Sequence, residues 1–145
     1  MMSRVDEAVS RFSEGFSCSQ AVCSVFAGDY GLTDEQALKV ASGFGGGMGQ
    51  TGGTCGVVSG AVIVLGLAYG ATSPDEKEAK AKTYALVQEF VAEFSRRHGA
   101  VDCPALLGCD LATPEGRERA RQEGLTRKVC PAYVRSAAEI LEQML

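Results

Sequence analysis

The chain has 145 residues, of which 46% are hydrophobic and 22% are charged, and its formal net charge is −4. This length fits one domain with a sizeable core. The acidic balance argues against the basic face of a nucleic-acid-binding protein, so we expect no nucleic-acid partner. The longest apolar run, residues 57–69, is shorter than the roughly 18–20 residues of a membrane-spanning helix. Because the first residues also lack the apolar core of a signal peptide, we expect no membrane insertion and a cytoplasmic location.

Three helices are expected in the first third of the chain, each introduced by a serine or threonine N-cap. The side-chain oxygen of such a residue accepts one of the unpaired backbone N–H groups of the first turn. The expected helices and their caps are residues 3–12 with Ser3, residues 17–27 with Ser17, and residues 34–42 with Thr33. Gln36 stands three residues after Thr33 and completes a capping-box pattern.

A glycine-rich loop, residues 43–54, leads into an apolar stretch that begins at Cys55. Ordering a glycine costs roughly 0.5–1 kcal/mol of extra backbone entropy, so this many glycines need a geometric reason. We predict a tight loop that feeds a buried central helix. Gly56 and Gly60, four residues apart, would let a second helix approach closely. At the helix start, Cys55 would meet unpaired N–H groups and the positive end of the helix dipole, which predicts a thiolate.

The second half of the chain predicts further helical segments. The first is a helix from Ser73 and Pro74 to about Arg97, with Tyr84, Val87, Val91 and Phe94 on its buried face. It is followed by one turn at Cys103 and a short helix capped by Thr113. The last helix has Cys130 and Pro131 near its start. Since no stretch alternates between polar and apolar residues with a period of two, we predict an all-α fold. The chain would form a single compact helical domain over residues 1–145, in which the glycine-rich loop precedes the buried central helix.

Four of the six cysteines fall at or near the predicted helix starts. These are Cys18, Cys55, Cys103 and Cys130. Each start would stabilise a thiolate by roughly 0.3–1 kcal/mol, and four of them could converge on one anionic centre. A metal or iron–sulfur site with four thiolate ligands is such a centre. Cysteine is also a small residue that is often buried in cores, so plain packing is the alternative.

The same residues resemble a known protein family. Cys18 is followed by the TCGVVSG segment of residues 54–60, then by Cys103 and Cys130. This order is similar to that of the redox-active proteins named after their C_GCAxxG_C_C motif, in which Cys23 and Cys109 have no counterpart. The resemblance covers nearly the whole chain and implies redox activity. A similar domain occurs in a multihaem cytochrome that also carries an iron–sulfur centre, which implies a cluster here as well.

In the first of three hypotheses, the four motif cysteines bind a cofactor and the protein transfers electrons. Cys18, Cys55, Cys103 and Cys130 would ligate an iron–sulfur cluster of the two-iron, 2Fe-2S type, or another metal ion. Backbone N–H groups of the loop would then approach the sulfurs and stabilise their negative charge. This hypothesis assigns cofactor binding to Gly47, Gly49, Gly53 and Gly56.

In the second hypothesis the chain is a metal-free thiol/disulfide redox protein or sensor. Cys55 would be the nucleophile, and Cys18 or Cys103 the resolving thiol. In the third, the chain is a helical structural or interaction module whose cysteines only pack. The first two hypotheses imply a redox partner protein. Assembly into a homo-oligomer, and whether the chain is an enzyme, stay open.

Overall fold

The computed structural model describes residues 2–145, and this part of the chain is built from helices. The helices are α1 (Arg4–Glu14), α2 (Cys18–Ala27), α3 (Asp34–Ala41), α4 (Gly45–Met48), α5 (Gly56–Tyr69), α6 (Lys77–His98), α7 (Cys103–Leu107), α8 (Pro114–Glu123) and α9 (Leu125–Met144), with 3₁₀ turns at Gly28–Tyr30 and Ser42–Phe44. No strand occurs in residues 2–145, where the extended backbone is limited to one isolated bridge between Thr54 and Asp102. The predicted all-α fold is confirmed.

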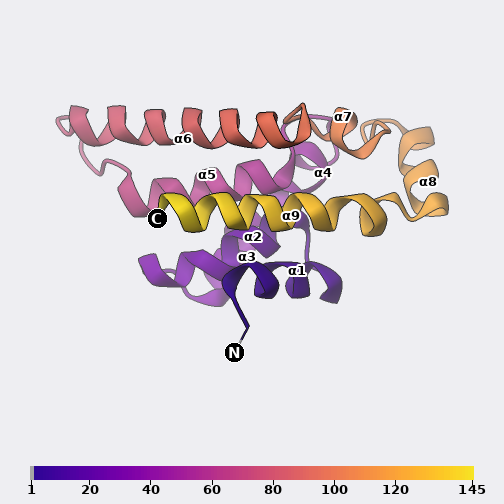
Figure 1. The fold of residues 1–145 in the computed structure, drawn as a ribbon, viewed down its shortest axis with the longest axis horizontal. Helices are drawn as coiled ribbons and strands as arrows, with labels where there is room; N and C mark the ends of the chain where they lie inside the picture. Colours follow the sequence, from indigo (N-terminus) through magenta and orange to yellow (C-terminus); the bar gives the residue numbers. More distant parts are fainter. Residues whose placement is uncertain (1) are drawn as a thin grey trace.

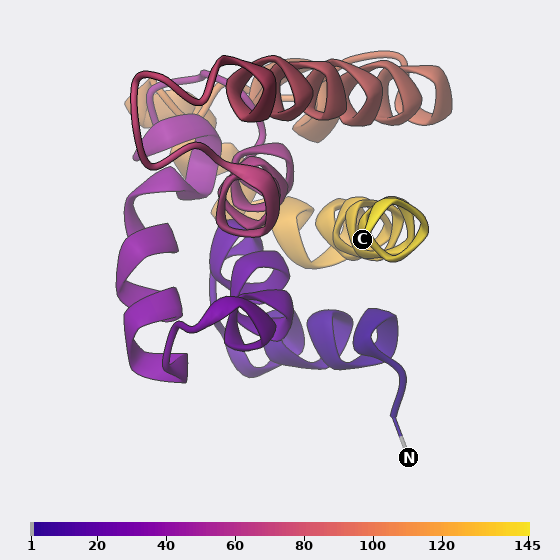
Figure 2. The ribbon, with the colours of Figure 1, turned by 90° about the vertical axis from the view of Figure 1, so that its left-hand side faces the viewer.

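The helix α5 lies in the middle of the molecule, as predicted for the central helix. It packs against α2, α6 and α9, and α2 in turn packs against α1 and α3. Figure 1 shows α6 and α9 running along the long axis, with α8 at one end of the molecule. In the view along that axis, α5 is surrounded by its neighbours (Figure 2). Within residues 2–145, no helix combines the length and the apolarity needed to cross a membrane.

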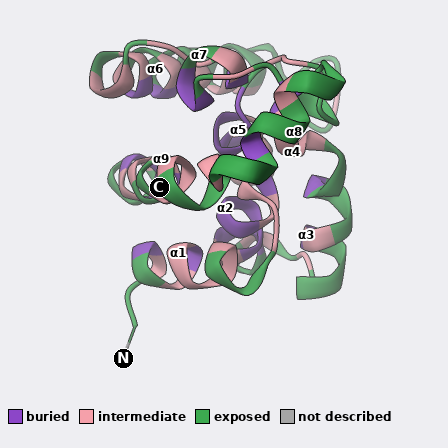
Figure 3. Ribbon diagram, turned by 90° about the vertical axis from the view of Figure 1, so that its right-hand side faces the viewer, coloured by how far each residue is buried: buried purple, intermediate pink, exposed green. Residues whose placement is uncertain are grey.

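Burial is concentrated in α2 and α5, while α3 and α8 are largely exposed (Figure 3). The buried side chains of α5 recur at the i, i+1, i+4, i+7 and i+8 spacing of a single helix face. They are Val57, Val58, Ala61, Val64 and Leu65. Since even one methylene of extra volume is felt in a well-packed core, this helix fixes the positions of the elements around it.

The close approach of α2 and α5 depends on the two glycines predicted to allow it. A Cβ atom added at Gly60 would lie 2.7 Å from the carbonyl oxygen of Ser19, and one added at Gly56 would lie 3.2 Å from the backbone nitrogen of Ser19. Ser19 is fully buried, and its hydroxyl donates a hydrogen bond of 2.8 Å to the carbonyl oxygen of Ala41. The backbone of α2 at Ser19 therefore packs directly against Gly56 and Gly60 of α5.

Four of the predicted N-caps are confirmed. The side chains of Ser3, Ser17, Thr33 and Thr113 each accept the N–H group of the third residue after them. Ser17 and Thr33 both belong to complete capping boxes. The helix ends are also where glycine predicted them, since Gly15 and Gly99 take left-handed conformations at the C-termini of α1 and α6.

Two features of α6 correct the prediction. The helix begins at Lys77, not at Ser73, because the Ser73 hydroxyl accepts the N–H group of Asp75 within a turn that precedes the helix. Tyr84 is 58% exposed rather than buried. The buried stripe of α6 is centred on Phe90 and Phe94, which turns Tyr84 toward solvent beneath the ammonium group of Lys80.

The start of α9 also differs from the prediction. The helix begins at Leu125, directly after Gly124 ends α8, so Cys130 lies in its second turn. Pro131 is inside the helix instead of at its first position. A proline there has no N–H group to donate, which leaves a carbonyl one turn earlier without its helical partner. Cys130 is therefore not at a helix N-terminus, contrary to the sequence-based expectation.

Candidate thiol site

The four cysteines of the motif line one cleft of about 600 Å³. They reach it from different elements: Cys18 from α2, Cys55 from the start of α5, Cys103 from α7 and Cys130 from α9. The two remaining cysteines are elsewhere. Cys23 is fully buried in the core, and Cys109 donates its thiol hydrogen to the carbonyl oxygen of Gly116. The structure thus gathers the four cysteines that the motif singled out.

Cys18 is the first residue of α2 and has the environment of a thiolate. Its sulfur accepts a hydrogen bond from the Cys55 thiol and further hydrogen bonds from the backbone N–H groups of Gly46, Ser19 and Cys18 itself. The Cys55 hydrogen bond is the main reason why the pKa of Cys18 is lowered to about 7, while burial acts in the opposite direction. A thiol with this pKa is substantially ionised near neutral pH.

The glycine-rich loop contributes to this environment through an unusual backbone. Five consecutive residues have positive φ angles: Gly46 (68°), Gly47 (70°), Met48 (65°), Gly49 (61°) and Gln50 (63°). The chain therefore makes a turn of left-handed helix, which costs about 1–2 kcal/mol per residue for residues with a side chain. Glycine has no such cost, which explains the density of glycines. The turn directs the Gly46 N–H group at Cys18.

Cys55 has the opposite protonation from the one expected. It is the N-cap residue of α5, but its sulfur accepts only one backbone hydrogen bond, from Val57. The hydrogen bond to Cys18, burial and the charge of Cys18 all raise the pKa of Cys55 above its usual range. Two adjacent sulfurs share one proton, and the sulfur with more N–H donors carries the charge. The donors around the pair thus favour the thiolate at Cys18 and the thiol at Cys55, the reverse of the expectation from the sequence.

Cys103 and Cys130 are neutral thiols in this cleft. Burial is the main cause in both cases, and the charge of Cys18 adds to it, so that the pKa of Cys103 rises to about 11 and that of Cys130 to about 12. The backbone of Cys103 is tied to the loop, since its N–H group donates to the carbonyl oxygen of Gly53 at 2.8 Å. The site thus combines one thiolate with three thiols.

The four glycines proposed to approach the cysteines have different roles. A Cβ atom at Gly56 would lie 2.5 Å from the sulfur of Cys18, and one at Gly47 would lie 2.7 Å from the Cβ atom of Cys103. Gly49 lines the cleft, whereas Gly53 only supports it through its carbonyl hydrogen bond to Cys103. Sequence reasoning missed Gly46, because the glycine density of the loop does not reveal which N–H group points at which sulfur.

The positions of the four cysteines do not meet the needs of a single metal ion. Four thiolates around one zinc or iron ion would each place their sulfur about 2.3 Å from it. Among residues 2–145, no group of three or more cysteine, histidine, aspartate or glutamate side chains is placed to hold a metal ion. The four cysteines share a cleft, but their positions do not form a site for a single ion.

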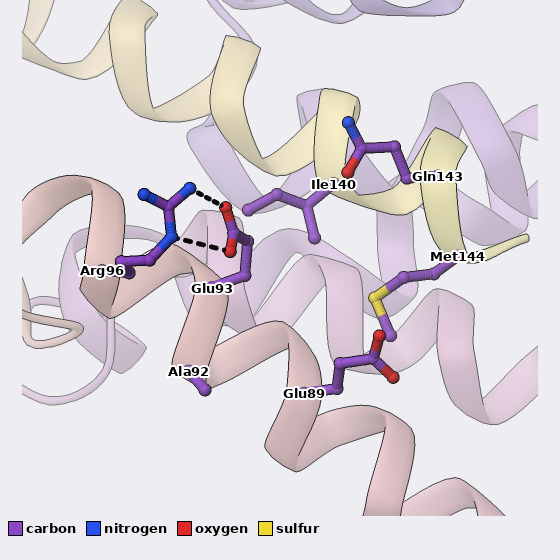
Figure 4. A pocket seen from close by; sticks show the side chains of 7 residues that line it. All are labelled: Glu89, Ala92, Glu93, Arg96, Ile140, Gln143 and Met144. Atoms are coloured by element: carbon purple, nitrogen blue, oxygen red, sulfur yellow. Dashed lines mark hydrogen bonds and ion pairs between the residues drawn. The ribbon is translucent and has the colours of Figure 1, made fainter.

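A second hollow lies between α6 and the C-terminal part of α9 (Figure 4). Its lining residues are Glu89, Ala92, Glu93, Arg96, Ile140, Gln143 and Met144. Glu93 is already paired with Arg96, through a hydrogen bond of 3.0 Å from the guanidinium Nε, as Figure 4 shows. This hollow contains no cysteine. The cleft that holds the four motif cysteines is therefore the candidate functional site.

Comparisons with known proteins agree with the cysteine pattern. Residues 16–144 match the family model described as "Putative redox-active protein (C_GCAxxG_C_C)". Neither the curated proteins nor the solved structures gave a match to the chain. The matched segment includes all four cysteines of the cleft, together with the glycine-rich loop and the central helix. The chain therefore belongs to the C_GCAxxG_C_C family of redox-active proteins.

Proposed function

We propose that this protein is a thiol/disulfide redox protein in which Cys18 is the nucleophile and Cys55 the resolving thiol. The observation that carries the proposal is the placement of Cys18 and Cys55 in one cleft, with the Cys18 sulfur against Gly56, the residue that follows Cys55. The Cys55 thiol and the backbone N–H groups of Gly46 and Ser19 lower the pKa of this sulfur. The pair opens into a cleft, as an attack on an external sulfur requires. These assignments reverse the roles that the sequence suggested for the two residues.

The reaction takes two exchange steps. The Cys18 thiolate attacks one sulfur of a substrate disulfide; a bond between Cys18 and that sulfur forms, the substrate S–S bond breaks, and the leaving sulfur takes the electron pair as a thiolate. In the second step Cys55 loses its proton to the released thiolate or to water and attacks Cys18. The Cys18–Cys55 disulfide forms, and the second substrate thiolate departs. The substrate is reduced by two electrons and the protein is oxidised.

The geometry favours this order of events. In the resting state, the hydrogen bond to Cys18 is the main cause that keeps Cys55 protonated. Once Cys18 is part of a mixed disulfide, its negative charge is gone, and the pKa of Cys55 falls. Cys55 thus becomes a nucleophile only when there is a mixed disulfide to resolve. A reducing compartment would return both thiols to the starting state, in keeping with the cytoplasmic location expected from the sequence.

The proposal is tested by pulsed alkylation with iodoacetamide between pH 5.5 and 9, with each cysteine quantified by peptide mass spectrometry. We expect Cys18 to react first, with a midpoint near pH 7, and the buried Cys23 to react last. Mild oxidation with diamide should then produce a Cys18–Cys55 disulfide that is absent from the Cys18→Ser and Cys55→Ser variants. A Cys18 that reacts no faster than the half-buried Cys109 outside the cleft, or a disulfide between other cysteines, would overturn the proposal.

The four-cysteine metal centre is the second candidate, supported by the fact that all four motif cysteines line the same cleft. A centre of this kind would require the sulfurs to move from their described positions, and we derive no chemistry from it. Purification without oxygen, followed by iron and acid-labile sulfide analysis, tests it. Stoichiometric iron that is lost in the Cys130→Ser variant would favour this candidate over thiol exchange, since Cys130 has no part in the exchange reaction proposed above.

A further inference from the structure

The cleft holds one basic side chain. Of all the residues that line it, Arg127 is the one that carries a positive charge, and the lining contains no aspartate or glutamate. This is unexpected in a chain with 18 acidic and 14 basic residues. Ser17, Ser42, Gln50 and Thr126 supply the other polar side chains of the lining. Apart from the Cys18 thiolate, the lining thus offers one side chain that can pair with an anionic group of a substrate and no carboxylate that can pair with a cationic group.

Arg127 is free to bind such an anion. It lies in the first turn of α9, a turn that contains no acidic residue. Within residues 2–145 it forms no ion pair, whereas Arg119 and Arg121 on the neighbouring α8 pair with Glu123 and Glu118. A guanidinium group presents a planar fork of N–H donors that matches a carboxylate. The unpaired Arg127 and the nucleophile Cys18 thus belong to the same cleft.

The size of the cleft points to a small molecule. Its volume of about 600 Å³ is within the range of roughly 300–1,000 Å³ that is usual for small-molecule sites. Apolar surface from Phe12, Phe16, Leu107 and Leu111 lines it beside the polar groups. Arg127 and Cys18 both line this volume.

We propose that the substrate is a low-molecular-weight disulfide with a carboxylate, which Arg127 binds while Cys18 attacks the sulfur. This inference rests on the proposed function and adds the substrate class to it. The first exchange is the one described above: the Cys18–sulfur bond forms, the disulfide bond breaks, and the departing half leaves as a thiolate with its carboxylate. Arg127 is a binding residue that selects the charge of the substrate and takes no part in the transfer of electrons.

The test uses three disulfides of similar size and different charge: 3,3′-dithiodipropionate (anionic), bis(2-hydroxyethyl) disulfide (neutral) and cystamine (cationic). The rate at which each forms a mixed disulfide with Cys18 is measured by mass spectrometry in the Cys55→Ser variant, which cannot resolve it. Each rate is divided by the rate with a free cysteine peptide. We expect the anionic disulfide to react about fivefold faster than the neutral one, the effect of roughly 1 kcal/mol from an exposed ion pair, and cystamine to react slowest.

The matched variants are Arg127→Gln and Lys128→Gln. Both remove one positive charge from the same turn of α9, but Lys128 does not line the cleft. The preference for the anionic disulfide should disappear in Arg127→Gln and persist in Lys128→Gln. If Cys18 reacts with all three disulfides at the same relative rate, or if both variants behave alike, the inference fails and the thiol function stands. If Cys18 reacts with none of them, the thiol function fails as well.

Discussion

The pKa of Cys18 depends on a neighbouring thiol as well as on the helix that it begins. The Cys55 hydrogen bond is the largest cause of the lowered pKa, ahead of the backbone N–H groups from Gly46 and Ser19. A helix start alone stabilises a charge by only about 0.3–1 kcal/mol. The thiolate therefore depends on a contact between α2 and α5 that neither segment provides by itself.

This dependence predicts opposite results for two substitutions at Cys55. Cys55→Ala removes the hydrogen-bond donor, so the pKa of Cys18 should rise toward its ordinary value near 9, since the backbone donors remain but the main cause is gone. Cys55→Ser keeps a donor of similar size, so the pKa should stay near 7. The pH dependence of Cys18 alkylation measures both values. Equal midpoints in the two variants would show that the Cys55 hydrogen bond does not set the pKa.

A second prediction at this scale concerns the glycine beneath Cys18. Gly56→Ala would place a Cβ atom 2.5 Å from the Cys18 sulfur and 3.0 Å from the carbonyl oxygen of Phe44, so one of them must move. We expect a loss of about 1–3 kcal/mol of stability, as for other overpacked sites, together with slower Cys18 alkylation.

The control for this substitution lies in the same helix. Nothing lies within 4 Å of a Cβ atom added at Gly66. Gly66→Ala should therefore stabilise the protein by about 0.5–1 kcal/mol, the usual gain in a helix interior, and leave Cys18 unchanged. Urea denaturation and alkylation of both variants provide the comparison. A Gly56→Ala protein as stable and as reactive as the wild type would contradict the described packing.

At the scale of elements, the left-handed turn of residues 46–50 connects the site to the fold. It delivers the Gly46 N–H group to Cys18, and its residue Gly47 packs against Cys103 and against the carbonyl oxygen of Gly53. The turn also retains two residues with side chains, Met48 and Gln50, at positive φ. Such conformations are costly and persist where the surrounding structure enforces them.

Gly47→Ala tests whether this turn serves the cysteines. The position has a φ angle of 70°, and an added Cβ atom would lie 2.7 Å from both Cys103 Cβ and the Gly53 oxygen. We expect the turn to reorganise, so that the pKa of Cys18 rises while the helical circular dichroism signal stays near that of the wild type. Gly43→Ala is the control, because nothing lies within 4 Å of its added Cβ atom. Complete unfolding of Gly47→Ala would instead assign the turn to general stability.

The elements also show which predictions a sequence can support. Caps such as Ser17 and Thr33 act within one helical turn, so the sequence around each of them is enough to predict it. The prediction that placed Cys130 at a helix start was wrong. It relied on the preference of proline for the first turn, whereas α9 already begins at Leu125, directly after α8, and contains Pro131 in its interior. The protonation of Cys18 and Cys55 could not be predicted, since it depends on an N–H group from the separate residue Gly46.

At the scale of the whole molecule, the cleft lies where several elements meet around α5. Cys55 belongs to the main core, whereas Cys103 belongs to a smaller apolar cluster that also includes Leu107, Leu111 and Ala120. The backbone N–H group of Cys55 donates to the carbonyl oxygen of Val101 at 2.7 Å, which ties the start of α5 to the segment before α7. Ionisation of the cysteines in the cleft is therefore linked to the free energy of unfolding of the whole protein.

This coupling gives the stability of the protein a pH dependence with a defined sign. The pKa of Cys18 falls from 9.0 to about 7 on folding, so between pH 7 and 9 the unfolded chain binds more protons at this residue than the folded one. Stability must then rise with pH through this window, and the contribution of Cys18 is lost as the pH falls through 7.

The pKa values of Cys103 and Cys130 rise to about 11 and about 12, so their contributions are present below pH 9 and lost above it. Urea unfolding in the presence of a reductant, at pH 6 to 10, should show that the stability difference between the wild type and Cys18→Ser grows from pH 7 to 9. Above pH 9 both proteins should lose stability, and the difference should shrink, because the raised pKa of Cys55 depends on Cys18 and adds to the loss in the wild type. A difference that does not change with pH would mean that Cys18 titrates alike in the folded and unfolded chains, and that the folded cleft does not hold a thiolate.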